Sequence, residues 1–87
     1  MGKNVNEWNE IATKGTKGSL ETTQALLYMG LCNYWGFGVP KNTKAGGNFI
    51  HLASTTSSNE LTELATGICY FGGFGVKADM AKAFSIF

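Results

Sequence analysis

A glycine-rich stretch of this chain occurs twice, at positions 29–39 and 66–76. The first copy reads MGLCNYWGFGV and the second reads TGICYFGGFGV. Identical residues recur at a constant offset of 37 positions: Gly30 and Gly67, Cys32 and Cys69, Gly36 and Gly73, Gly38 and Gly75. A repeat of this period is typical of a solenoid, in which one supersecondary unit is stacked on the next.

The length and composition set the size of the core. The chain has 87 residues, which is enough for one small domain. A domain of this size buries only ~60% of its unfolded surface, so we expect a small margin of stability. Hydrophobic residues make up 44% and charged residues only 15% of the chain, so the hydrophobic content is ordinary and the charge is low.

The charge pattern argues against two classes of partner. The formal net charge is +1, and all seven basic residues are Lys, although Arg is the residue best suited to phosphate and guanine contacts. Nucleic acid is therefore not expected as a partner. No run of 18 apolar residues exists and the first residues lack the apolar core of a signal peptide, so we expect a cytoplasmic protein without a membrane partner.

Apolar residues at spacings of three and four predict helices. We expect them over residues 4–14, 20–34, 43–53 and 58–71, with a last helix after Asp79. Ser19, Asn42 and Asp79 are predicted N-caps. Ser57 followed by Glu60 fits a capping box ahead of the fourth helix.

Glycines mark the corners and one contact between helices. Gly36 and Gly38 tolerate a positive φ and let the chain turn back, and Phe37 between them is expected to plug the corner. Gly30 lies within a helix at a cost of roughly 1 kcal/mol, which predicts the close approach of another helix, as at the equivalent Gly67. The pair at 46–47 is expected to weaken the helix over 43–53.

Short glycine-rich corners make each pair of helices an antiparallel hairpin. The predicted fold is therefore all-α, an α-solenoid of stacked hairpins in a single domain over residues 1–87. We divide it into a leading half-repeat at 4–18, a first repeat at 19–56 and a second, shortened repeat at 57–87.

The corner residues carry a family resemblance. Gly-x-Cys-x-Tyr, then Gly-x-Gly-Val, then Asp-x-x-Lys-Ala resembles the Sel-one-like repeat, a relative of the tetratricopeptide repeats. The positions that match are Gly67, Tyr70, Gly73, Gly75, Val76, Asp79, Lys82 and Ala83 in the second unit, and Ala25, Gly30, Gly36, Gly38, Val39, Pro40, Lys44 and Ala45 in the first. The first unit departs from the family in having Asn33 where Tyr is usual and one residue fewer between Val39 and Lys44.

The resemblance implies a non-catalytic adaptor that binds a protein or peptide, without a cofactor. In such stacks the first helix of each unit lines the concave face. The expected partner-binding residues are therefore Leu27, Leu31, Tyr34, Trp35, Leu61, Leu64, Ile68 and Phe71. The alternative is that these residues are core, and the binding interpretation is strongest for Tyr34 and Trp35, because aromatic residues are common interface anchors.

Apolar residues at the two ends predict self-association. They are Trp8 near the start and Phe84, Ile86 and Phe87 near the end. Solenoids cover their ends with polar capping units, which this sequence lacks. We therefore expect a homo-oligomer or a partner subunit at one or both ends.

Chemical sites are not expected. Cys32, Cys69 and His51 lack the close spacing of a zinc site and form no nucleophile triad. We expect both cysteines to be buried free thiols in a reducing compartment. The glycine-rich corners follow a helix rather than a strand, unlike phosphate loops. Two alternatives to an adaptor remain: a fragment of a longer solenoid, or a small inhibitor that occludes a larger complex, with an enzyme the least favoured class.

Overall fold

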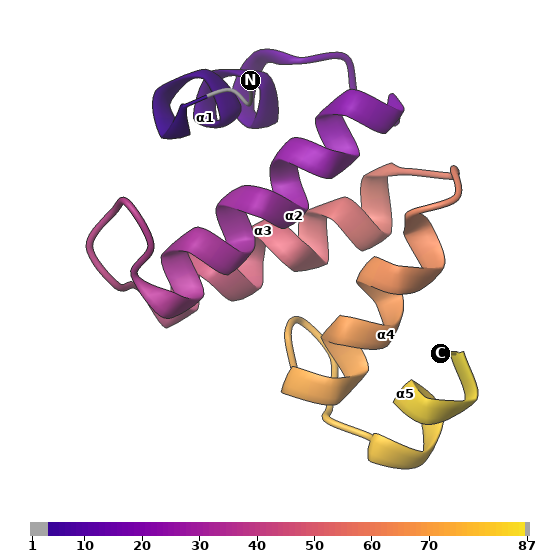
Figure 1. Ribbon diagram of the computed structural model, residues 1–87. Helices are drawn as coiled ribbons and strands as arrows, with labels where there is room; N and C mark the ends of the chain where they lie inside the picture. The colour runs from indigo at the N-terminus through magenta and orange to yellow at the C-terminus, as the bar shows by residue number, and fades with distance from the viewer. Residues whose placement is uncertain (1–3, 87) are drawn as a thin grey trace.

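A computed structural model describes residues 4–86 of the chain, and these residues form helices joined by short loops (Figure 1). The helices are α1 (Val5–Lys14), α2 (Leu20–Trp35), α3 (Thr43–Thr56), α4 (Thr62–Gly72) and α5 (Met80–Ile86). Each helix packs on the next one along the chain, and the pairing of α2 with α3 is the most extensive. The prediction of an all-α fold is confirmed for this part of the chain.

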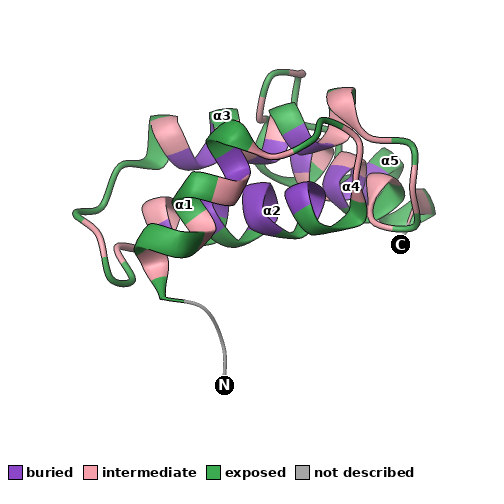
Figure 2. Ribbon diagram, turned by 90° about the horizontal axis from the view of Figure 1, so that it is seen from above, coloured by how far each residue is buried: buried purple, intermediate pink, exposed green. Residues whose placement is uncertain are grey.

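The core lies where α1, α2, α3 and α4 meet (Figure 2). Its buried members are Ala12, Ala25, Leu26, Leu27, Met29, Ile50, Ala53, Ala65 and Cys69. Helix α1 adds the predicted apolar stripe, in which Val5, Trp8 and Ile11 are half-buried against this cluster. Helices α1 and α5 each bury only one residue fully, so the ends of the molecule are less protected than its middle.

The two glycine corners have the same hydrogen bonds. In the first, Gly36 and Phe37 donate their backbone N–H to Cys32 O at 2.8 and 2.9 Å. In the second, Gly73 and Phe74 donate to Cys69 O in the same way. All four corner glycines, at positions 36, 38, 73 and 75, have φ between 72° and 79°, as predicted. The duplicated sequence therefore folds into duplicated backbone geometry.

Helices α2 and α3 approach each other at two glycines. A Cβ on Gly30 would lie 2.5 Å from Ile50 Cγ1, and a Cβ on Gly46 would lie 2.6 Å from Gly30 O. The close approach predicted at Gly30 is confirmed. Helix α3 is continuous through Gly46, whose missing side chain lets the backbones of the two helices meet. Gly67 is buried on α4, and the close approach expected there stays a prediction.

The start of α4 differs from the predicted capping box. Ser57 donates its hydroxyl to Ala53 O rather than capping α4, which begins four residues beyond the expected start, at Thr62. Asn59 organises the turn instead: its Oδ1 accepts from the N–H of Leu61 at 2.9 Å, and its Nδ2 donates to Gly18 O at 3.1 Å. This amide ties the start of α4 to the loop that precedes α2.

The end of α3 was predicted too early for a local reason, while the two N-caps were predicted correctly. Helix α3 continues three residues beyond Ala53, because the hydroxyls of residues 54–56 donate to carbonyls one turn earlier and so remain satisfied within the helix. Asn42 and Asp79 are both N-caps, each accepting from the backbone N–H three residues later. They lie at the same offset of 37, so α3 and α5 begin at equivalent positions of the two units.

Helix α1 takes a different register from α3. Gly38 packs on Val5 at the start of α1, whereas Gly75 packs on His51 in the second half of α3. Helix α2 has 16 residues and α4 has 11, so the first helices of the two units also differ in length. None of the helices within residues 4–86 is long and apolar enough to cross a membrane.

Candidate binding cleft between α2 and α4

An open apolar cleft lies between the C-terminal halves of α2 and α4. It has a volume of about 430 Å³. Its lining residues are Leu31, Tyr34 and Trp35 from α2, Ile50 from α3, Ile68, Phe71 and Gly72 from α4, and Phe74 from the second corner. A cavity of this volume falls within the range of ligand sites, and apolar and aromatic side chains dominate such sites.

The two walls of the cleft are built from equivalent positions of the duplicated sequence. Leu31 faces its counterpart Ile68, and Tyr34 faces Phe71, at the constant offset of 37. The pair of Trp35 and Gly72 breaks this symmetry, because one wall carries an indole where the other has no side chain. On the side of α4, the ring of Phe74 lies beside Gly72.

Gly72 makes room for the floor. A Cβ at Gly72 would lie 2.6 Å from the ring of Phe74, so only glycine allows the ring to lie there. The same ring passes over Gly47 of α3, where a Cβ would lie 2.8 Å away. It also packs edge-on against Tyr34, with ring centroids 5.4 Å apart. Three elements therefore hold the floor in place.

Phe37, the counterpart of Phe74, is not seated in this way. It is 64% exposed rather than plugging the first corner as predicted. At the position equivalent to Gly72 the first copy carries Trp35, and at the position equivalent to Gly47 it carries Glu10. The first corner therefore lacks both glycines on which the ring of Phe74 packs.

Five of the eight residues expected to bind a partner line the cleft: Leu31, Tyr34, Trp35, Ile68 and Phe71. Trp35 and Phe71 are 58% and 53% exposed, so they reach solvent at the rim. Leu27 is buried in the core, and Leu61 is half-buried against it. Leu64 is exposed but lies outside the cleft.

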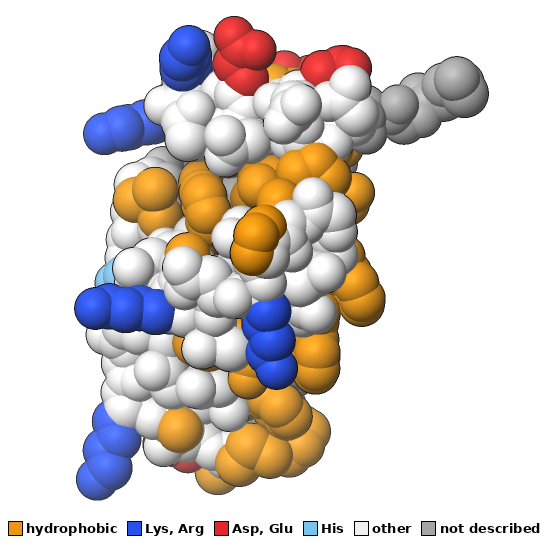
Figure 3. Space-filling model, turned by 90° about the vertical axis from the view of Figure 1, so that its left-hand side faces the viewer, with side chains coloured by type: hydrophobic (Ala, Val, Ile, Leu, Met, Phe, Trp, Pro, Cys, Tyr) orange, Lys and Arg blue, Asp and Glu red, His pale blue; other side chains and the backbone are white. Residues whose placement is uncertain are grey.

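The cleft is electrically neutral. None of its lining residues carries a formal charge. Further along α2, a side-chain hydrogen bond with Cys32 raises the pKa of Tyr28. Figure 3 shows hydrophobic side chains gathered along one edge of the molecule, while acidic side chains cluster at the end where α1 lies.

The residues expected to self-associate do not share one surface. Trp8 lies on α1, where its ring packs against Tyr28 of α2 with centroids 5.3 Å apart. Phe84 and Ile86 lie on α5 at the other end of the molecule (Figure 1). Phe84 is 64% exposed and Ile86 is half-buried. Phe87 lies outside the described residues.

The cysteines and the histidine are separate. Both thiols are free and buried, as predicted. Burial raises the pKa of Cys69, although its hydrogen bond to Ser54 Oγ at 3.6 Å partly opposes this. His51 packs against the second corner, with Nδ1 buried and unpaired among the described atoms. Within residues 4–86, no group of three acidic, His or Cys side chains is arranged to hold a metal ion.

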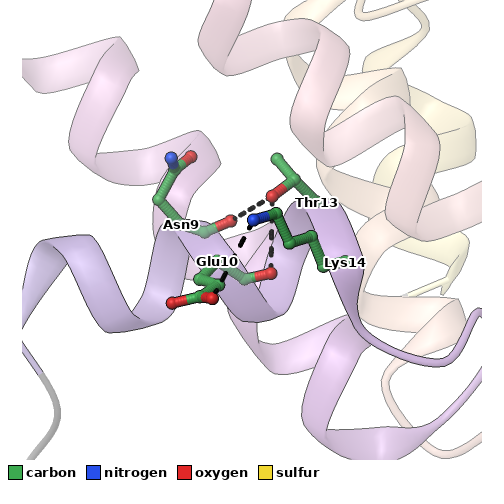
Figure 4. A network of polar contacts seen from close by, with 4 residues as sticks. All are labelled: Asn9, Glu10, Thr13 and Lys14. Carbon is green, nitrogen blue, oxygen red and sulfur yellow. Dashed lines mark hydrogen bonds and ion pairs between the residues drawn. The ribbon is translucent and has the colours of Figure 1, made fainter.

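The polar network on α1 is a local feature of its surface (Figure 4). Thr13 Oγ1 donates to the carbonyl of Asn9 at 2.9 Å, and Lys14 Nζ lies 4.0 Å from Glu10 Oε1. The ion pair is highly exposed and spaced i,i+4, so it contributes little. These side chains satisfy one another and the helix backbone, and they do not converge on a cavity.

Ile50 and Phe74 are the site residues that the sequence interpretation missed. Ile50 was assigned to the apolar side of its helix, and the second corner was treated only as a turn. The signal for Phe74 was that the second copy has Gly72 where the first has Trp35. The ring of Phe74 packs on this glycine. No protein-family model, curated protein or solved structure matches this chain.

Proposed function

We propose that this chain is a non-catalytic protein-binding module that accepts apolar side chains of a protein or peptide in the cleft between α2 and α4. The observation that carries the proposal is the convergence of Leu31, Trp35 and Phe71 on one uncharged cleft. The sequence places these residues 40 positions apart at most, and the fold joins them. Exposed apolar surface on this scale marks interaction sites.

The rim and floor suit this role in different ways. Trp35 and Phe71 are more than half exposed, so a ligand would remove a large apolar area from water. Phe74 and Ile50 are held by packing, so the floor needs little rearrangement on binding. Because buried charge is absent, binding carries no cost of desolvating an ion.

We further propose that the chain is a short α-solenoid of the Sel-one-like repeat type. The matching hydrogen bonds of the two corners and the shared N-cap offset support this proposal. In such a stack α2 and α4 are the first helices of successive units, and the cleft between them belongs to the concave face. A role as an adaptor follows by analogy with that family.

A peptide-display selection on the purified chain tests the proposal. Leu31→Ala removes part of one cleft wall, and Leu52→Ala on α3 is its matched control, because both leucines are 43% exposed. We expect Leu31→Ala to weaken the selected peptides by roughly 1 to 2 kcal/mol, or about five- to thirty-fold in Kd. Leu52→Ala should change Kd by less than about two-fold.

Two results would reject the proposal. One is a selection that yields no peptide above background on a folded chain. The other is a set of peptides whose affinity falls equally for both variants, or only for Leu52→Ala, since binding would then lie outside the cleft. Circular dichroism of each variant excludes unfolding as the cause of a loss.

A further inference from the structure

The first corner presents an aromatic side chain on a fixed backbone. Phe37 lies between Gly36 and Gly38, whose φ angles are 79° and 75°. Its own N–H is bonded to Cys32 O at 2.9 Å, while its side chain is 64% exposed. A side chain mounted in this way loses little conformational freedom when it docks. The corner therefore has the form of an interface anchor.

The second corner shows how a phenylalanine at this position can pack. Its counterpart Phe74 packs on two glycines and on the edge of Tyr34. Phe37 lacks these glycines in its own corner, because Trp35 stands where the second copy has Gly72. The cleft offers a similar environment, with aromatic walls and a volume of about 430 Å³. A cavity of ~150 Å³ is enough for a benzene ring, so a phenyl side chain fits with room to spare.

We propose that a second copy of this chain occupies the cleft: in a two-fold symmetric dimer, Phe37 of each copy inserts between α2 and α4 of the other. Phe37 follows Trp35, a wall of the cleft, by two residues. Two residues span at most ~7 Å, so the anchor lies close to the rim of its receptor, and a two-fold axis can pair each with its counterpart. The proposal rests on the proposed function in that the cleft must accept apolar side chains.

The available surface matches the needs of a dimer. Leu31, Trp35, Phe37 and Phe71 are 43%, 58%, 64% and 53% exposed. Together they leave on the order of 400 Å² of apolar surface per copy. A stable interface buries ~800 Å² per partner, of which somewhat more than half is apolar. The neutral lining also avoids repulsion between two copies of like charge.

The dimer has a consequence for the proposed function. A peptide and Phe37 of the partner copy compete for the same cleft, so the dimer is a closed form. Binding of a peptide should therefore release monomers, and the apparent affinity for peptide should fall as the concentration of the chain rises.

Sedimentation equilibrium from micromolar to millimolar concentration tests the dimer. Phe37→Ala removes the anchor, and Phe84→Ala is its matched control, since both side chains are 64% exposed. We expect the wild-type chain to dimerise reversibly. Phe37→Ala should raise the dimer dissociation constant by at least ~30-fold. Phe84→Ala should leave it within about two-fold of wild type.

Complementation tests the exchange itself. Phe71→Ala damages the cleft and keeps the anchor, whereas Phe37→Ala damages the anchor and keeps the cleft. Each variant alone should remain monomeric at concentrations that dimerise the wild type. Their mixture restores one intact contact, so it should contain heterodimers.

Three results would overturn the proposal: a wild-type chain that is monomeric throughout, a dimer that depends on Phe84 but not Phe37, or a mixture without heterodimers. Peptide binding by Phe37→Ala separates the two proposals, because this variant keeps every residue of the cleft. If it binds peptide while the wild type never dimerises, the inference fails and the proposed function stands. If the wild type dimerises through Phe37 but no peptide binds, the dimer stands and the proposed peptide-binding function fails.

Discussion

Adding one methyl group at Gly46 should separate helices α2 and α3. A Cβ at this position would lie 2.6 Å from Gly30 O, 2.7 Å from Tyr34 N and 2.9 Å from Tyr34 Cβ. The first two atoms belong to the backbone of α2 and cannot rotate away. Ordinary contacts begin near 3.4 Å, so α3 must move outward by several tenths of an ångström.

The magnitude follows from two opposing effects. Alanine stabilises a helix interior by up to ~1 kcal/mol relative to glycine. Overpacking of a tight contact costs about 1 to 3 kcal/mol, and a gap of 0.5–1 Å forfeits roughly a quarter to a half of each dispersion contact along the interface. The interface between α2 and α3 is the most extensive in the molecule, so the loss should dominate. We expect Gly46→Ala to lower the free energy of unfolding by about 2 kcal/mol.

Urea denaturation followed by far-ultraviolet circular dichroism measures this change in the free energy of unfolding. Thermal unfolding should show a melting temperature lowered by about 10 °C. Asn48→Ala is the matched control, because it places the same alanine on the exposed side of α3. That variant should be neutral or slightly more stable. A Gly46→Ala chain as stable as Asn48→Ala would refute the close approach of α2 and α3.

Two further changes test the second corner and the buried thiol. Gly73 and Gly75 share a φ of 72°, but a Cβ on Gly75 would also strike the ring of His51. Denaturation should therefore show a loss of more than ~1 kcal/mol for Gly75→Ala and a smaller loss for Gly73→Ala, and equal losses would exclude the contact with His51. Because burial raises the pKa of Cys69 above its ordinary 9.0, the folded chain holds this proton more tightly than the unfolded chain. Stability should decline as pH rises above that value, and a pH titration of unfolding in Cys69→Ala should show a weaker decline; an unchanged slope would argue against burial of the thiol.

The sequence alone predicted the elements whose signals are local. The corner glycines could be predicted from the sequence, because a positive φ favours glycine and the glycine pattern recurs at a fixed offset. N-caps at Ser19, Asn42 and Asp79 were also correct. The capping box at Ser57 failed because Asn59, through contacts far away in the sequence, holds the turn in another conformation.

The cleft could be predicted only in part. Helical spacing placed Leu31, Trp35 and Phe71 on the exposed sides of their helices, but the same spacing included Leu27, which is buried. The difference depends on how the neighbouring helices pack on α2, which the pattern of a single helix does not contain. Phe37 and Phe74 have identical neighbours on both sides, and only a glycine two residues earlier gives the second ring its place in the floor.

The fluorescence of Trp35 tests the cleft most directly. Trp8→Phe leaves Trp35 as the single tryptophan, and its 58% exposed indole should emit at the long wavelength of a hydrated ring. The titration uses the double variant Trp8→Phe, Phe37→Ala at a concentration where it is monomeric. Adding a peptide selected on the chain should shift the emission of Trp35 to shorter wavelength in proportion to binding. An emission maximum that stays unchanged at saturation would place the bound peptide elsewhere and contradict the cleft as the binding site.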